Sequence, residues 1–252
     1  AEGMVFAKVE NNVGVVVEVN SETDFVARNE HFKNFVTSIG AQVLKTKPAG
    51  DLLKDSYYAN PSQKVEDYLK ETIAKIGENI VCRRFERYEV SPTSMVHSYV
   101  HGEGKIGVLL EITVGSESLS KNENVRTAAQ DICLHIAAMS PMAVSSNEIP
   151  AEVVSKEKEI LKAKNIEQGK KPEMVDKIVE GQIRKFLAEN CLLDQAFVKN
   201  PDLKISDYLA GVAKAVGGSL SIKRFVRFEL GQGIEKQTVD FAAEVAAQTK
   251  TH

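Results

Sequence analysis

The chain has 252 residues, 43% of them hydrophobic and 27% charged, which is typical of a globular protein with one large or two small cores. Its formal net charge of -3 gives no basic excess, so the composition argues against direct contact with nucleic acid. No apolar run approaches the roughly 20 residues that a membrane-spanning helix requires, and the N-terminal residues lack the pattern of a signal peptide.

The first predicted element is a β-hairpin. Residues 4–10 and 13–20 are rich in apolar and β-branched side chains, and they flank the turn-forming pair Asn11 and Asn12. The pairing of these two stretches predicts the start of a small antiparallel sheet.

The segment Ser-Glu-Thr-Asp-Phe-Val-Ala-Arg at residues 21–28 links this hairpin to a helix. Thr23 or Asp24 can cap the helix, because a side-chain oxygen at that position accepts a free backbone N–H. Phe25 has two interpretations. It lies seven residues before Phe32, and this spacing favours a place in the core, whereas a helix that begins later would leave the ring outside on the turn.

Two helices and a third strand complete the first unit. Apolar side chains recur at helical spacing between Phe32 and Val43, and a second helix is predicted over residues 65–76 with Gly77 at its C-terminal end. Residues 80–90 then form the strand that closes the sheet.

The same plan occurs a second time in the chain. Gly14 lies in an apolar stretch that matches the stretch around Gly107, which is 93 residues later, whereas Gly77 and the strand after it match Gly217 and its strand, 140 residues later. The difference predicts an insertion of about 47 residues, between residues 141 and 203, in the second copy. The second copy is predicted to have strands at 94–101, 106–114 and 220–230 and helices around 129–137 and over 205–216.

The insertion is predicted to be a helical hairpin. Its first helix begins at Pro150, the chain breaks at residues 169–172, and a second helix continues to about Asn190. The apolar side chains expected to face one another are Val153, Ile160 and Leu161 from the first helix and Met174, Ile178, Ile183 and Phe186 from the second. Such a thin arm is either an extension of the domain or a surface that contacts the body, a second copy or a partner.

These elements define an α+β fold with two similar subdomains, each a three-stranded antiparallel sheet with helices packed on one face. We divide the chain into core subdomain N at residues 1–92, core subdomain C at 93–140 and 204–231, and a dimerisation or coiled-coil arm at 141–203. Residues 232–252 form a C-terminal module, in which an amphipathic helix is predicted at 238–249.

No motif for catalysis, metal binding or cofactor binding emerges. Residues 102–107 match the letters of a dinucleotide-binding loop, but they open a strand rather than a helix. His97 and His101 lie on a strand without further ligands, which favours a hairpin surface over a metal site. The three cysteines are odd in number and far apart, which indicates reduced thiols and a cytoplasmic location. We therefore expect no catalytic residue, no metal and no cofactor.

Two further groups of side chains have structural interpretations. Arg84 with Arg87, and Arg224 with Arg227, alternate along the third strand of each copy and are interpreted as lining a solvated sheet face. His135 lies on a mostly apolar helix and is interpreted as a core or edge histidine whose hydrogen bonds are satisfied.

Several segments together resemble the bacterial elongation factor Ts family. They are VEVNSETDFVARNEHF, KIGENIVCRR, SYVHGEGKIGVLL, IVEGQIRKF and RFVRFELGQGIEKQTVDFAAEVAA, and the similarity runs from about Gly3 to Lys250. The resemblance implies an exchange factor, not an enzyme, that binds elongation factor Tu in its GDP-bound or nucleotide-free state and promotes GDP release during translation elongation. It also implies a homodimer formed through the helical hairpin.

The resemblance implies which residues contact this partner. The family's Asp-Phe pair falls on Asp24 and Phe25, and it is expected to enter the GTPase near the Mg²⁺ and phosphate site. The other implied contact positions are Ile76, Gly77, His101, Val198 and Gln248. The sequence does not contain the family's N-terminal three-helix domain, and from this difference we expect weaker binding and slower exchange.

Two hypotheses from other classes stay open. A dimeric adaptor or scaffold would bind proteins without any effect on nucleotide release, and a small-molecule enzyme that uses residues 102–107 would bind a dinucleotide. Neither function requires the Thr-Asp-Phe-Val segment, which is therefore the feature that separates them from an exchange factor.

Overall fold

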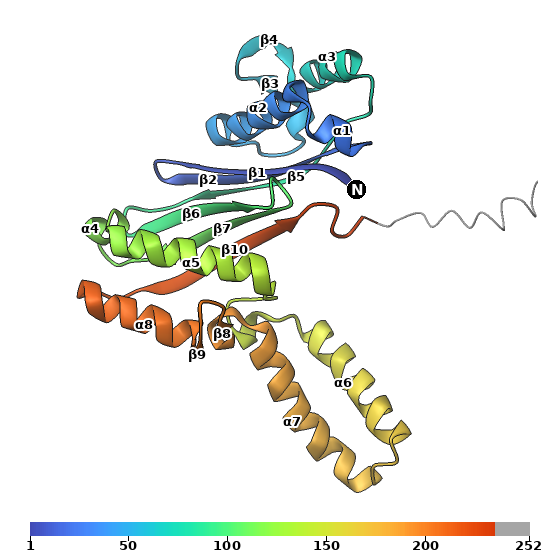
Figure 1. Cartoon of the computed structure of the whole chain (residues 1–252), viewed down its shortest axis with the longest axis vertical. Helices are drawn as coiled ribbons and strands as arrows, with labels where there is room; N and C mark the ends of the chain where they lie inside the picture. Colours follow the sequence, from blue (N-terminus) through green and yellow to red (C-terminus); the bar gives the residue numbers. More distant parts are fainter. Residues whose placement is uncertain (235–252) are drawn as a thin grey trace, which may run out of the picture.

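The structure is a computed structural model of the chain, and it describes residues 1–234. Two three-stranded antiparallel sheets form the body, helices lie on their outer sides, and a helical pair projects away from the body (Figure 1). This arrangement confirms the α+β fold expected from the sequence. The helix predicted at residues 238–249 lies outside the described residues. None of the helices within residues 1–234 combines the length and the apolar character needed to cross a membrane.

The first sheet is built from the predicted hairpin and the strand that follows the second helix. Its order is β1-β2-β5, with all neighbours antiparallel, and its strands are Glu2–Glu10, Val13–Ser21 and Val81–Glu89. The helical elements of this copy are α1 at Asp24–Ala27, α2 at Glu30–Thr46, the 3-10 turn η1 at Leu52–Lys54 and α3 at Val65–Ile76. The sequence did not predict the small ribbon between η1 and α3, which consists of β3 at Ser56–Tyr57 and β4 at Asn60–Lys64.

The second sheet has the equivalent construction. Its order is β10-β7-β6, and its strands are Ser221–Glu229, Ile106–Thr113 and Ser94–His101. Its helical elements are α4 at Glu117–Ser120, α5 at Glu123–Met139, the 3-10 turns η2 at Ser146–Glu148 and η3 at Leu192–Asp194, and α8 at Ile205–Val216. Its ribbon consists of β8 at Ala196–Phe197 and β9 at Asn200–Lys204.

The repeat offset changes between α5 and η3. The first residues of α2 and α5 differ by 93, and the first residues of η1 and η3 differ by 140, as do those of the two ribbons. The extra residues therefore enter after α5, and the unpredicted ribbons are part of the repeat. The division of the chain into domains remains a proposal.

Equivalent asparagines begin the main helices of the two copies, and a glycine ends the next helix of the first copy. The side chain of Asn29 accepts the N–H of His31 at 2.8 Å before α2, and Asn122 accepts the N–H of Asn124 at 2.8 Å before α5. Gly77, with a φ of 82°, ends α3 in the left-handed conformation that glycine adopts without steric cost. These signals fix where the helices begin and end along the chain.

The outer face of each sheet and its helices enclose a hydrophobic core. Phe32, Phe35 and Ile39 of α2 are buried against the first sheet, and Ile132 and Ile136 of α5 are buried against the second. Their spacing along the chain is the helical spacing that predicted these helices.

A third apolar cluster lies between the two sheets, and the repeated glycines allow its close packing. A Cβ added at Gly14 would come within 2.7 Å of Val96, and one added at Gly107 would come within 2.5 Å of Val5. Real side chains do not approach so closely, so these positions accept only glycine unless the facing valine side chains move. The glycines that revealed the repeat are thus contact points between the two copies.

The repeated arginines do not line a solvated face, and that expectation is wrong. Glu18 and Glu111, which are equivalent in the repeat, are 0% and 1% exposed. Arg84 donates to Glu18 at 2.6 Å, and Arg224 donates to Glu111 at 2.7 Å. Each arginine compensates a buried carboxylate, which would otherwise destabilise the fold strongly.

The second arginine of each pair has a different role. Arg87 donates to the backbone carbonyl of Val43 at 3.1 Å, and Arg227 donates to that of Ala137 at 3.0 Å. These carbonyls lie in the last turns of α2 and α5, where no further helical N–H is present to bond them. Arg87 and Arg227 therefore fasten each main helix to its own sheet.

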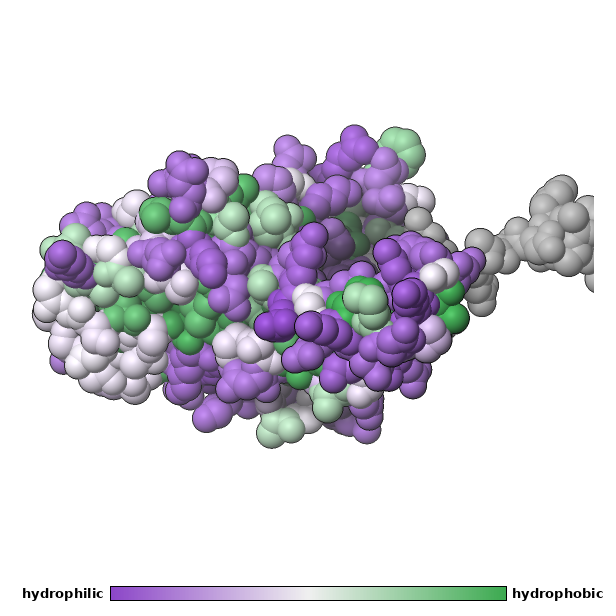
Figure 2. All heavy atoms as spheres, turned by 90° about the horizontal axis from the view of Figure 1, so that it is seen from below, coloured by the Kyte–Doolittle hydropathy of each residue, from purple (hydrophilic) through white to green (hydrophobic). Residues whose placement is uncertain are grey.

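The predicted helical hairpin is present, but its apolar seam is displaced from the predicted one. The pair consists of α6 at Ala151–Glu167 and α7 at Pro172–Asn190. The side chains that meet in the seam are Val175, Val179 and Ile183 of α7, with Val154, Leu161 and Leu187 beside them. Ile160 and Met174, which were expected there, are 51% and 52% exposed. The side of the pair that is visible in Figure 2 is mostly hydrophilic, with scattered apolar side chains.

Candidate functional site

The segment after β2 forms a single helical turn that is capped as the sequence predicted. Thr23 is the N-cap residue, and its Oγ1 accepts the N–H of Val26 at 3.3 Å. Asp24 follows in the first turn, and its carboxylate bonds the Arg28 guanidinium at 2.7 Å on the surface. The turn is thus closed by its own polar side chains.

Phe25 stands outside the body and is 80% exposed. Its spacing from Phe32 favoured a place in the core, and that interpretation is wrong. Asn29 caps a new helix between the two residues, so Phe25 and Phe32 belong to α1 and α2 and do not share one helical face. The alternative interpretation, with the ring outside on the turn, is confirmed.

A second segment of the chain holds this turn in place. Glu78 accepts the backbone N–H of Thr23 at 3.0 Å and the hydroxyl of Thr23 at 2.7 Å. In return, Glu22 accepts the backbone N–H of Asn79 at 3.3 Å. Local sequence patterns do not identify Glu78, because its partner lies 55 residues away.

This link brings the end of α3 to the base of the exposed ring. Ile76 is half-buried and packs against the first core, while Gly77 is exposed and has open space where a Cβ would lie. The predicted contact residues Asp24, Phe25, Ile76 and Gly77 are therefore brought together. We refer to these four residues, with Thr23 and Glu78, as the Phe25 site.

His101 lies at the same end of the body but on the other sheet. It is the last residue of β6, and its Nδ1 lies 2.8 Å from the hydroxyl of Tyr99. The turn that follows touches the start of the first sheet, since the carbonyl of Gly104 accepts the N–H of Val5 at 2.9 Å. Helix α1 contacts β1 and β2, so it also lies near this end of the first sheet (Figure 1).

Val198 lies apart from the Phe25 site, on the turn of the second copy's ribbon, and its side chain is 41% exposed. Its backbone N–H donates to Nδ1 of His135 at 3.1 Å, and Nε2 of His135 lies 2.9 Å from the amide oxygen of Gln195. Nδ1 is therefore the acceptor and Nε2 carries the proton. His135 is fully buried with both ring nitrogens bonded, as expected, and burial lowers its pKa from the usual value.

The remaining predicted contact, Gln248, lies outside the described residues. Within residues 1–234 no group of three or more His, Cys, Asp or Glu side chains is placed to hold a metal ion. Residues 102–105 form the hairpin turn between β6 and β7, so they do not begin a helix as a dinucleotide loop does.

The second copy lacks the features of the Phe25 site at the equivalent positions. Ser118 is equivalent to Phe25, and Gly218 is equivalent to Glu78. Leu119 packs closely on Gly218, because a Cβ on that glycine would approach the leucine side chain to 2.4 Å. The fold of the module therefore requires neither the exposed ring nor the carboxylate that holds its turn.

Comparison with known proteins gives one consistent result. The family model described as Elongation factor TS matches residues 22–232. A protein named Elongation factor Ts from Bdellovibrio bacteriovorus is 60% identical over 252 residues, which is 100% of this chain and 82% of the relative. Proteins of the same name from Symbiobacterium thermophilum and Syntrophotalea carbinolica are 45% and 43% identical over 251 residues each, with 98% and 99% of this chain and 80% and 82% of the relatives covered.

Proposed function

The chain belongs to the elongation factor Ts family, and we propose that it catalyses no covalent step but accelerates GDP release from elongation factor Tu through the Phe25 site. The observation that carries this proposal is the exposed ring of Phe25, at 80%, on a turn fixed by Thr23 and Glu78. Burial of a phenylalanine side chain contributes roughly 1.5–3 kcal/mol, which is available to a partner because this protein does not use it.

The turn presents the ring in a preorganised position. Ordering a flexible segment on binding reduces affinity, and the Thr23–Glu78 hydrogen bonds avoid much of that loss. Asp24 beside the ring adds a carboxylate that can accept hydrogen bonds from a partner's backbone or side chains. Such a wedge can displace a neighbouring helix or loop in the partner.

Displacement of that kind is sufficient for nucleotide exchange. GTPases hold their nucleotide through backbone N–H groups around the phosphates and through Mg²⁺, so a small shift of these groups lowers nucleotide affinity. Linkage makes the effect reciprocal: the factor by which this protein lowers GDP affinity is the factor by which GDP lowers the affinity of this protein. No nucleophile, general base or metal is needed on the exchange factor.

The other contacts form part of the same proposal. Ile76 and Gly77 directly precede Glu78, which is bonded to the turn that carries the ring, so they would meet the same partner surface. His101 would extend this surface across the second sheet. Val198 would form a separate contact, because it lies on the second copy's ribbon. Gln248 is proposed as a further contact.

The helical hairpin is proposed to hold two copies together in a cytoplasmic homodimer. Ile160, Ile166 and Met174 are large apolar side chains that α6 and α7 leave exposed, and a second copy could cover them. Dimerisation is not needed for the Phe25 site, because all of its residues lie in the first structural repeat of a single chain.

The proposal is tested with elongation factor Tu loaded with fluorescent GDP. Addition of this protein should raise the rate of GDP release, and excess GDP should weaken the complex between the two proteins. A dimeric adaptor would form a complex whose stability does not depend on GDP and would leave the release rate unchanged. That result would exclude the exchange function.

A further inference from the structure

Strand β6 has an open edge. Within residues 1–234 it pairs with β7 alone. The carbonyl of Thr93 accepts the N–H of Val114 at 2.9 Å, so these two residues are a hydrogen-bonded pair of the β6–β7 ladder. Hydrogen-bonded and non-hydrogen-bonded pairs alternate along an antiparallel ladder. Along β6, Val96 and Ser98 therefore fall in non-hydrogen-bonded pairs, and their backbone N–H and C=O groups point away from β7. Another chain can form hydrogen bonds with these groups.

The edge of β1, which is the equivalent strand of the first repeat, is already hydrogen-bonded at the corresponding residue. Val5 of β1 is equivalent to Ser98 of β6, and its outward N–H donates to the carbonyl of Gly104 at 2.9 Å. In the part of the chain that the structure describes, the N–H of Ser98 has no such acceptor. The two copies therefore differ in whether this edge is available.

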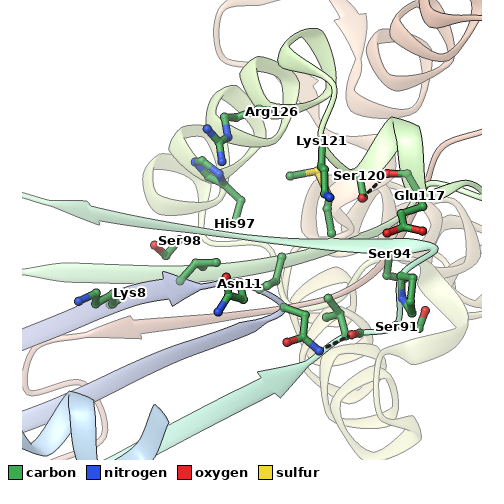
Figure 3. Close-up of a pocket in the computed structure, with 17 residues that line it drawn as sticks. Lys8, Asn11, Ser91, Ser94, His97, Ser98, Glu117, Ser120, Lys121 and Arg126 are labelled. Carbon is green, nitrogen blue, oxygen red and sulfur yellow. Dashed lines mark hydrogen bonds between the residues drawn. The ribbon is translucent and has the colours of Figure 1, made fainter. Parts of the chain in front are cut away.

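A groove of about 860 Å³ follows the open edge. Its floor is the run of β6 from Ser94 to Ser98. One wall is the β1–β2 turn with Val9 and Asn11, and the other is the start of α5 with Arg126 (Figure 3). An extended peptide needs this combination of a free strand edge and two walls that contact its side chains.

The groove carries positive charge that the protein itself does not neutralise. Lys8, Lys121 and Arg126 line it, and among residues 1–234 none of them forms an ion pair with a carboxylate. His97 lies beside Arg126 (Figure 3), and its pKa is lowered by burial and further by that positive charge. Glu117 is the acidic residue of the lining. A ligand with negative charge would therefore bind favourably here.

We propose that this groove binds an extended acidic segment of another protein, which adds to β6 as a further strand. Side chains of a strand alternate between the two faces of a sheet. Met95 and His97 face α5, whereas Val96 faces the first sheet. The bound segment should therefore alternate acidic residues, which face Lys121 and Arg126, with small apolar residues, which face Val96 and the β1–β2 hairpin.

The groove is well separated from the Phe25 site. It lies at the Asn11 end of the β1–β2 hairpin, whereas Asp24 follows the opposite end, at Ser21. A strand of this length places the two ends roughly 25 Å apart. This protein can therefore bind elongation factor Tu and the acidic segment at the same time, and either property can fail without the other.

The first experiment titrates the protein with a synthetic peptide of alternating glutamate and valine and records its amide NMR spectrum. The amide signals of Val96 and Ser98 should shift and their hydrogen exchange should slow, whereas those of the Phe25 turn should not change. A peptide methylated on alternate backbone nitrogens, so that its N–H groups toward β6 are lost, should bind much more weakly. Equal binding of the methylated peptide would overturn strand addition, and so would binding of a nucleoside diphosphate in place of the peptide.

The second experiment uses variants of the groove. Ser98→Pro removes the outward N–H, and proline is tolerated on strand edges, while Ser98→Ala keeps that N–H and is the matched control. Arg126→Glu should weaken peptide binding roughly threefold to tenfold, and Lys177→Glu on the helical hairpin should not. Peptide affinity that is unchanged in Ser98→Pro, or lowered equally by both charge reversals, would contradict the proposal. The rate of GDP release should be unchanged in all these variants.

Discussion

Thr23 and Glu78 are 55 residues apart in the sequence and are joined by two hydrogen bonds, of 3.0 and 2.7 Å. One bond fixes the backbone of the residue that caps α1, and the other fixes its hydroxyl, which in turn accepts the N–H of Val26. The position of Phe25 therefore depends on a carboxylate that bonds a different residue, Thr23. The equivalent residue in the second copy, Gly218, cannot form this link.

Glu78→Ala should reduce the rate of nucleotide exchange, although Glu78 is not the residue whose side chain is proposed to enter the partner. Loss of the two bonds frees the turn, so Phe25 is no longer held in one position, and the free energy of unfolding should fall by about 1 kcal/mol. Stopped-flow release of labelled GDP and thermal unfolding measure the two effects. Glu71→Ala, on the exposed side of α3, is the control and should change neither. Normal exchange by Glu78→Ala would show that the link has no role.

Gly107→Ala should destabilise the body because the added methyl group meets Val5 at 2.5 Å. Overpacking of this kind costs about 1–3 kcal/mol, and chemical denaturation measures it. Gly181→Ala provides the matched comparison: it lies inside α7 with no atom within 4 Å of the new Cβ, and it should stabilise the protein by up to about 1 kcal/mol. Equal effects of the two substitutions would contradict the close packing of the sheets.

Stability should decrease as the pH falls below about 6.5, in part because of His135. Its folded-state pKa is lowered by burial, so below the ordinary value the unfolded chain binds more protons than the folded one, and the stability present at neutral pH is lost. His97 contributes in the same direction. His135→Gln should be less stable at pH 7.5 but should lose less stability between pH 7.5 and 5.5, as measured by denaturation at each pH. An unchanged pH dependence would exclude this role for His135.

Removal of residues 150–190 should weaken self-association while GDP release stays close to normal. The hairpin carries the exposed side chains that a second copy would cover, and the Phe25 site lies elsewhere. Sedimentation of the whole and shortened chains provides the comparison. The same molecular mass for both forms would remove the dimerisation proposal and leave the exchange proposal intact.

The sequence predicted the repeated elements well because their signals are local. Helix limits at Gly77 and Gly217 and the hairpins around Asn11 and residues 102–105 depend on neighbouring residues, and the structure confirms them. Spacing alone did not place Phe25, because the cap at Asn29 interrupts the helical period between it and Phe32. A single polar residue therefore decided whether the ring is buried or exposed.

Other features depend on contacts between distant segments and could not be predicted from local patterns. The roles of Arg84 and Arg224 follow from buried carboxylates on neighbouring strands. The role of Glu78 follows from its contact with Thr23, which lies 55 residues earlier in the chain. The hairpin seam was displaced because α6 and α7 each carry apolar residues on more than one face, so spacing did not select between Met174 and Val175.

The most direct test of the exchange mechanism is the rate of GDP release from elongation factor Tu in the presence of Phe25→Ala. The ring is 80% exposed, so the substitution should leave the fold intact, and circular dichroism provides that check. Ser118→Ala, at the equivalent position of the second copy, is the control. We predict that Phe25→Ala lowers the stimulated rate at least several-fold while Ser118→Ala leaves it unchanged. A normal rate with Phe25→Ala would contradict the account.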